Sequence, residues 1–332
     1  QFFSRRSPSS LLTETAGPYV PPLVPAVSVR REDGLRLLKK AGSRASVELE
    51  CEVVHGARGL TVVGERPGDR EGIVVLSAHH DHWLSGAADN LLGVAMSLAL
   101  AGGLEGRYTL RVISFGAEES GAPWFSKWYW AWGSRRYVEY LRERGELEEL
   151  VGVVNLDVVA RGRLTVSASG PEFLEPLREL LGDRPRYTYD LPYFDSYSFS
   201  SAGVAALTLH TMDDYLELYH TDRDLPGALD PAVVSEALTA AREVLRRLLR
   251  EGTAFYRYES YSRILRELVG SLNGIEGCEE LLGFVSRVDE RRARVLRRVL
   301  VRGVFEGRYE EDLEPLSSEF APHLLCLRDL ES

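Results

Sequence analysis

From residue 47 to residue 250, short apolar runs alternate with longer stretches of helical periodicity. Two of the runs, residues 72–78 (GIVVLSA) and 151–160 (VGVVNLDVVA), are almost continuously apolar, which is typical of strands buried on both faces. Residues 90–101 and the amphipathic stretch 231–250 are typical of helices. Because strands that alternate with helices build a mostly parallel sheet covered by helices, we predict a three-layer α/β/α domain.

The same patterns divide the chain into three parts: an N-terminal segment (1–45) rich in Pro, Ser and Gly, the α/β domain (46–252), and a C-terminal helical extension (253–332). The remaining expected strands are residues 23–29, 46–54, 60–64, 108–115 and 203–210. The remaining expected helices are residues 31–41, 134–144, 172–181, 258–272, 279–288 and 289–304.

Composition excludes several classes of protein. Fifty acidic residues against forty basic ones give a net charge of −10, which disfavours nucleic-acid binding. No apolar run reaches the roughly 18 residues that a membrane-spanning helix needs, and three cysteines do not form a disulfide framework. We therefore expect a soluble protein with no nucleic-acid or membrane partner, favour the cytoplasm over export, and leave a homo-oligomer open.

Polar side chains with metal-binding chemistry follow the expected strands, at the edge where α/β sheets bind ligands. They are His79-His80-Asp81 after residues 72–78, Gly86-Ala87-Ala88-Asp89-Asn90 in the next loop, Glu118-Glu119 after residues 108–115, Asp157 within 151–160, and Tyr219-His220-Thr221 after residues 203–210. Carboxylates and imidazoles suit zinc and related divalent metals. Several carboxylates gathered in one cleft would repel each other, and bound cations relieve that repulsion.

These five motifs, in this order, resemble the co-catalytic dizinc peptidases, a family that includes bacterial leucyl aminopeptidases, aminopeptidase Y and glutamate carboxypeptidase. The resemblance covers about residues 47–250. In addition, residues 24–34 (VPAVSVRREDG) resemble the end of the protease-associated domain that is often inserted in these enzymes. Only its last portion is present, so we expect the sequence to begin partway through a longer protein.

The resemblance implies a site for two zinc ions, with Co²⁺ or Mn²⁺ as substitutes. Asp89 would bridge the two ions, His79 and Asp157 would complete one site, and Glu119 and His220 would complete the other. Three protein ligands per metal leave a position open for water, as a catalytic site requires.

The resemblance also implies two catalytic roles beside the metals. Glu118 would be the general base that activates a metal-bridged hydroxide and delivers a proton to the leaving amine. Asp81, two residues beyond His79 on an extended segment, would hold the other ring nitrogen of that histidine. The peptide bond between Asp89 and Asn90 would be cis.

The resemblance has two departures, and neither removes an expected ligand. Ala88 stands where family members often carry a second Asp. Residues 194–199 (FDSYSF) keep the Asp and Phe of a family motif but lack its His.

We therefore predict a zinc-dependent exopeptidase that acts on peptides, most plausibly an aminopeptidase. A carboxypeptidase of the glutamate carboxypeptidase type needs cleft arginines to hold a carboxylate, for which Arg107, Arg135, Arg136 and Arg161 are the candidates. A glutaminyl cyclase or a non-catalytic, receptor-like binding module remain further alternatives.

Two other patterns carry weaker predictions. Residues 122–132 (APWFSKWYWAW) contain four of the five tryptophans, and form either a wall of the substrate pocket or an aromatic packing surface. Five arginines at helical spacing predict a solvated or salt-bridged helix face: Arg287, Arg291, Arg294, Arg298 and Arg302. His210 is expected to have a structural role.

Overall fold

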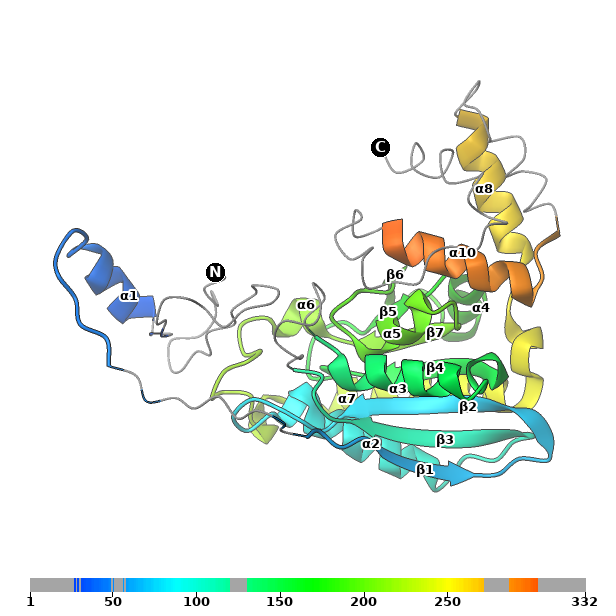
Figure 1. Cartoon of the computed structure of the whole chain (residues 1–332), viewed down its shortest axis with the longest axis horizontal. Coiled ribbons are helices and arrows are strands. Elements are labelled where there is room, and N and C mark those ends of the chain that lie inside the picture. The colour runs from blue at the N-terminus through cyan, green and yellow to red at the C-terminus, as the bar shows by residue number, and fades with distance from the viewer. Residues whose placement is uncertain are drawn as a thin grey trace.

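A seven-stranded sheet forms the centre of the molecule (Figure 1). The computed structural model describes residues 27, 29, 31–48, 50, 56, 58–119, 130–271 and 287–303. Its strands are β1 (Val62–Arg66), β2 (Arg70–His79), β3 (Tyr108–Phe115), β4 (Leu150–Leu156), β5 (Thr165–Ala168), β6 (Arg186–Tyr189) and β7 (Ala206–His210). Their order across the sheet is β1-β3-β2-β4-β7-β5-β6.

The middle of the sheet is parallel and its margins are not. Strands β3, β2, β4 and β7 pair in parallel, whereas β1 runs antiparallel to β3, and β5 runs antiparallel to β7. The carboxyl ends of the four parallel strands therefore meet at one edge of the sheet, where α/β folds bind ligands.

Helices cover both faces of the sheet, as predicted. Helices α2 (Leu92–Ala101), α4 (Pro171–Leu181) and α7 (Pro231–Glu251) pack on one face, and α3 (Trp132–Glu143) and α5 (Asp195–Ser201) on the other. The other described helices are α1 (Arg31–Leu38), α6 (Met212–Tyr215), α8 (Glu259–Ser271) and α10 (Glu290–Gly303). Within the described residues, no helix combines the length and apolar character that crossing a bilayer requires.

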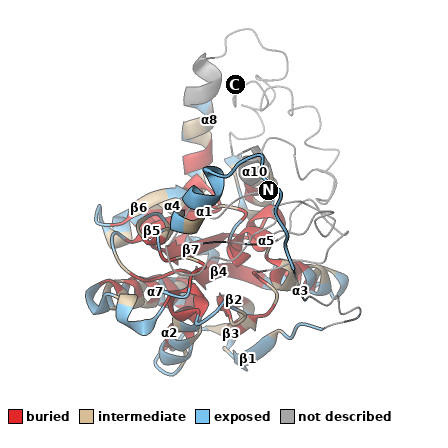
Figure 2. Ribbon diagram, turned by 90° about the vertical axis from the view of Figure 1, so that its left-hand side faces the viewer, coloured by how far each residue is buried: buried red, intermediate tan, exposed pale blue. Residues whose placement is uncertain are grey.

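Alternation along β2 shows how the two faces are filled. Val74 and Leu76 pack in one core with residues of α2, α4 and α7. Ile73 and Val75 point to the other face and pack with residues of α3 and α5. The central strands β2, β4 and β7 are therefore buried along most of their length, whereas the edge strand β1 is largely exposed (Figure 2). His79 shares the face of Ile73 and Val75, because residues two apart along a strand point the same way.

The periodic elements predicted from the sequence are confirmed to within a few residues, and residues 108–115 form a strand as predicted. Four of the described strands and α-helices were not predicted: β5, β6, α5 and α6. Of the strand expected at 46–54, residues 46–48 are not in a strand, and most of the rest lies outside the described residues. The expected strand at 23–29 and the expected helix at 279–288 also fall largely or wholly outside them.

The C-terminal helices follow the α/β body directly. Helix α10 packs against α5, and α8 contacts α4 before it projects from the body (Figure 1). The side chain of Arg297 on α10 is fully buried, with Nε 2.7 Å from the Glu172 carboxylate and Nη1 2.8 Å from that of Glu290. Thus α10 is attached to the α/β body through a buried ion network.

Candidate metal centre

The predicted ligands come together at the carboxyl edge of the parallel strands. His79 is the last residue of β2, Glu118 and Glu119 follow β3, and Asp157 follows β4. The remaining two are contributed by loops: Asp89 lies in the segment Ala87–Leu91, and His220 follows α6. All six side chains are at least nine-tenths buried.

Asp89 lies at the centre of the cluster, with its two carboxylate oxygens facing different histidines. Its Oδ1 is 3.2 Å from Nε2 of His79, and its Oδ2 is 3.1 Å from Nε2 of His220. This is the arrangement that a carboxylate shared between two metal ions requires.

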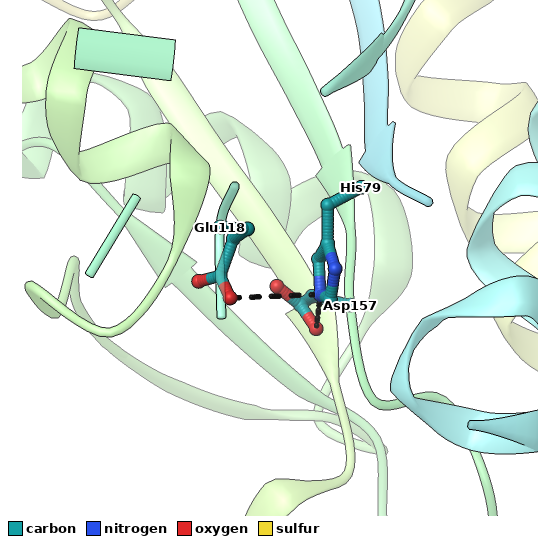
Figure 3. A group of neighbouring side chains, drawn as sticks. All are labelled: His79, Glu118 and Asp157. Carbon is teal, nitrogen blue, oxygen red and sulfur yellow. Dashed lines mark ion pairs between the residues drawn. The ribbon is translucent and has the colours of Figure 1, made fainter. Parts of the chain in front are cut away.

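Each histidine has a second carboxylate of its own. Oδ1 of Asp157 lies 3.4 Å from Nε2 of His79, and Oε2 of Glu119 lies 2.8 Å from Nε2 of His220. Glu118 approaches from another side, with Oε2 3.8 Å from Nε2 of His79, as Figure 3 shows. The geometry therefore forms two half-sites joined by Asp89.

The donor atoms of the cluster fit a divalent metal. Within the described part of the chain, His79 Nε2, Asp89 Oδ2 and both Glu119 side-chain oxygens are buried without a hydrogen bond. Donor atoms of His79, Asp89 and Glu119 lie within 4.8 Å of one another, as do those of His79, Glu118 and Asp157. Because buried polar atoms are normally satisfied, these unsatisfied atoms of zinc-ligand type indicate a metal centre.

The charge balance of the cluster also indicates a metal centre. Burial and the charge of Asp89 raise the pKa of Glu119 to about 8, and burial raises the pKa of Glu118 and of Asp157. Burial opposes ionisation of Asp89 too, but the His220 and His79 rings on either side of its carboxylate outweigh this effect and lower the pKa of Asp89. The protein alone supplies too little positive charge to keep these carboxylates ionised, and metal cations would supply the rest.

Asp81 connects the first ligand to the Glu118-Glu119 pair. Its carboxylate accepts hydrogen bonds from the backbone N–H groups of Glu118 and Glu119, each at 3.1 Å. The Nδ1 of His79 lies 2.9 Å from the Asp81 carbonyl oxygen and 3.7 Å from its carboxylate. Asp81 thus contacts the ring chiefly through its carbonyl oxygen, rather than through the carboxylate that the resemblance implied, and its carboxylate holds the Glu118-Glu119 backbone.

Comparison with known protein families assigns the chain to one of them. The sequence profile of Peptidase family M28 matches residues 61–245, more than half of the 332 residues. The chain belongs to peptidase family M28. The matched residues contain all of the strands and every side chain of the metal centre, so membership indicates a peptide hydrolase.

Solved structures resemble this M28 domain over part of their length. BSAP, a zinc aminopeptidase from Bacillus subtilis, is 23% identical over 57% of this chain and 50% of that chain, with a TM-score of 0.49. An aminopeptidase from Aneurinibacillus sp. strain AM-1 is 25% identical over 57% and 47%, with a TM-score of 0.47. A glutaminyl cyclase from an Acidobacteriales bacterium is 19% identical over 57% and 74%, with a TM-score of 0.49. The chain spans about half the length of the two aminopeptidases. Comparison with curated proteins gives no match.

The backbone of this M28 domain is unusual next to its ligands. The peptide bond between Asp89 and Asn90 is cis, as the family resemblance implied. Ala117, Val158 and His220 have positive φ angles of 60°, 45° and 56°. Such angles are uncommon for residues other than glycine and cluster at functional sites.

Asp224 is a buried residue of the M28 site that the sequence did not single out. Its carboxylate accepts hydrogen bonds from the backbone N–H groups of Ala88 and Asp89. The available signal was its position four residues after His220, in a loop already rich in acidic residues.

The other singled-out residues lie around the M28 site without joining the metal cluster. His80 contacts Ser114, and His82 is exposed. His210 is buried, with Nε2 2.7 Å from Ser167 Oγ. Of the aromatic segment 122–132 only residues 130–132 are described, and there Trp130 makes an edge-on contact with Tyr193.

Proposed function

We propose that this M28 protein is a zinc-dependent aminopeptidase with two metal ions. The observation that carries the proposal is the position of Asp89, whose two carboxylate oxygens lie 3.2 and 3.1 Å from the Nε2 atoms of His79 and His220. His79, Asp157 and Asp89 would hold one ion, and Glu119, His220 and Asp89 the other. When bound, a pair of zinc ions supplies Lewis acidity that polarises the scissile carbonyl and lowers the pKa of a water molecule.

Glu118 is the proposed general base. Its buried carboxylate lies beside the ligands, and the assigned half-sites are complete without it. Burial raises its pKa, which suits a group that accepts a proton from the attacking water and returns it to the leaving amine. Asp81 holds the backbone N–H of Glu118 and so keeps the base directed at the reacting carbonyl.

The candidate arginines favour an aminopeptidase over a carboxypeptidase for acidic residues. Arg107 directly precedes β3, at the opposite edge of the sheet from the cluster. Arg136 pairs with Glu139, and Arg161 lies 3.7 Å from Glu217. The fourth candidate, Arg135, is buried and lies over the ring of Trp132. A clamp built from these candidates would therefore rest on Arg135 alone, whereas an acidic C-terminal residue needs a firmly held carboxylate.

A substrate panel and a metal titration test the proposal together. We expect hydrolysis of aminoacyl-4-nitroanilides, no hydrolysis of N-blocked dipeptides ending in glutamate, and two zinc equivalents per chain. Asp89→Ala should lose both ions, because only this carboxylate is shared. Chelator-treated protein should be inactive and should recover on zinc addition.

Three other results would each support an alternative function. Cleavage of N-blocked, glutamate-ended dipeptides alone would replace the proposal with a carboxypeptidase. Cyclisation of N-terminal glutamine with one bound zinc would indicate a glutaminyl cyclase. Two bound ions without turnover of any substrate would indicate a binding module.

A further inference from the structure

Three successive backbone N–H groups in the segment of the bridging ligand bond to one residue, Asp224. Ala87 donates to its carbonyl oxygen at 3.3 Å. Ala88 donates to its Oδ1 at 2.7 Å, and Asp89 donates to its Oδ2 at 3.2 Å. Both carboxylate oxygens and the carbonyl oxygen of a single aspartate thus hold the chain that carries Asp89.

These N–H groups need an external acceptor because the local backbone is not a regular helix. Asp89 has φ −119° and ψ 87°, and Asn90 has φ −139° and ψ 34°, well outside helical values. Ala88 and Asp89 are buried, and a buried N–H without an acceptor is strongly unfavourable. Asp224 therefore makes this irregular ligand loop possible.

Asp224 is itself held in place from the opposite side. It is 2% exposed, and Tyr215 donates a hydrogen bond from its hydroxyl to Oδ1 at 2.8 Å. The Asp224 N–H bonds to the carbonyl oxygen of Thr221 at 3.1 Å, directly after His220. The turn that carries His220 and the loop that carries Asp89 are consequently joined through one side chain.

We propose that Asp224 is a positioning residue that fixes Asp89 relative to His220, and so sets the affinity of the half-site formed by Asp89, Glu119 and His220. This inference rests on the proposed dizinc site. Asp81 makes the equivalent contact with the backbone of Glu118 and Glu119. Asp224 holds the segment of Asp89 and belongs to the turn of His220, and Asp81 holds the backbone of Glu119. Each proposed ligand of that half-site is thus attached to one of these two aspartates.

The test compares Asp224→Asn with Asp213→Asn, which removes a charge from an exposed side chain of the same region. An asparagine keeps one acceptor oxygen but turns an NH₂ group towards the second N–H, so one hydrogen bond is lost. We expect Asp224→Asn to bind the second zinc equivalent about 10–100-fold more weakly in competition with a chromophoric chelator. The other equivalent should weaken less, because its half-site keeps His79 and Asp157, and Asp213→Asn should stay close to wild type. The midpoint of thermal unfolding of the metal-free protein should fall by only a few degrees, because a single buried N–H loses its acceptor.

Two results would overturn the proposal. One is wild-type affinity for both zinc equivalents in Asp224→Asn. The other is an equal weakening of both equivalents together with a large loss of metal-free stability, which would show a purely structural role. If Asp224→Asn does not fold, Tyr215→Phe tests the proposal instead. Removal of the Tyr215 hydroxyl should weaken binding of the second zinc equivalent several-fold. An unchanged affinity would refute the proposal. A wild-type protein that binds fewer than two zinc ions would instead refute the proposed function.

Discussion

Glu118 and Glu119 are adjacent in the sequence but have different surroundings. Oε2 of Glu119 lies 2.8 Å from His220, whereas Oε2 of Glu118 lies 3.8 Å from His79. Ala117, with φ 60°, precedes the pair and turns the chain so that neighbouring carboxylates diverge. Two residues of one type can therefore take different roles, one as a ligand and one as a base.

Replacing the proposed base should separate catalysis from metal binding. Glu118→Gln keeps the size of the side chain and removes its ability to accept a proton. We expect kcat to fall by about 10²–10⁴-fold, while zinc content and thermal stability stay near wild type. Steady-state kinetics and metal analysis of the same preparation measure both. Turnover at the wild-type rate would contradict the assignment of the base.

At the scale of residues, the sequence predicts the side chains of the buried cluster better than the residues that support them. His79, Glu119 and Asp157 could be found because they follow apolar strands, where a polar side chain stands out. Asp224 could not, because its partners are backbone N–H groups, which every residue except proline offers. No pattern of side chains in the sequence records such a contact.

At the scale of elements, α5 shows where periodicity fails. All seven of its residues are buried, yet four are serines and the sequence DSYSFSS has no apolar stripe. Its serines are hydrogen-bonded inside the protein. Ser196, for example, bonds to Asp190 and Thr208, and Thr208 in turn accepts from Asn155. A helix stabilised by a buried polar network looks like a loop in the sequence.

The arginines of α10 make contacts beyond the predicted solvated or salt-bridged face. Arg294 is salt-bridged, with Nε 3.3 Å from Glu148 and 3.2 Å from Glu290. Arg294 and Arg298 also donate hydrogen bonds to backbone carbonyls of the α/β body, at Leu150 and Ala202 among others. Arg297, outside that stripe, is the fully buried one, and also donates to the carbonyl of Gly203. Hydropathy treats arginine as an exposed residue and cannot detect a buried partner such as Glu172.

Breaking this network should be costly. Arg297→Met leaves the buried carboxylate of Glu172 without its 2.7 Å partner. We expect the free energy of unfolding to fall by about 3–5 kcal/mol, measured by urea denaturation. The double variant Glu172→Gln/Arg297→Met should recover part of this loss, because it leaves no unpaired charge.

Arg246→Ala is the matched control for that experiment. Arg246 pairs with Glu243 on the surface of α7, and its loss should change stability by less than about 0.5 kcal/mol. If Arg246→Ala and Arg297→Met change the free energy of unfolding equally, the buried network contributes no more to stability than a surface ion pair.

At the scale of the whole molecule, acid should destabilise the fold through His210. Burial, with a smaller effect of Arg186, lowers the pKa of His210 to about 3, from an ordinary value near 6.5. Between these values the unfolded chain binds a proton that the folded chain does not, so stability falls as the pH drops. The loss below pH 6.5 should be about 1.4 kcal/mol per pH unit from this group alone.

Urea unfolding of the metal-free protein at pH 7, 5.5 and 4.5 measures this loss. His210→Gln should show a shallower decline over that range, and His82→Gln, which changes an exposed ring, should follow the wild type. Parallel declines for wild type and His210→Gln would mean that other groups control the acid sensitivity.

The parallel core of the sheet and its edge strand β1 were predictable, whereas the margin formed by β5 and β6 was not. Long apolar strands such as β2 and β4 carry a strong signal, because both of their faces are buried. Strands β5 and β6 have four residues each, and include the polar sequence RYTY. They depend on pairing with neighbours distant in the sequence, which no local pattern contains.

The loops of the site are held through their backbone N–H groups. This affects which residues of such a site can change in sequence. Position 88 must supply an N–H and a side chain small enough for its buried surroundings of Val158, Tyr215 and Leu218, but no particular functional group. Ala88 meets this demand although relatives often carry an aspartate there. Proline alone is excluded by chemistry, since it has no N–H to donate. Lineages can therefore exchange the residues between the ligands while inheriting the ligand geometry unchanged.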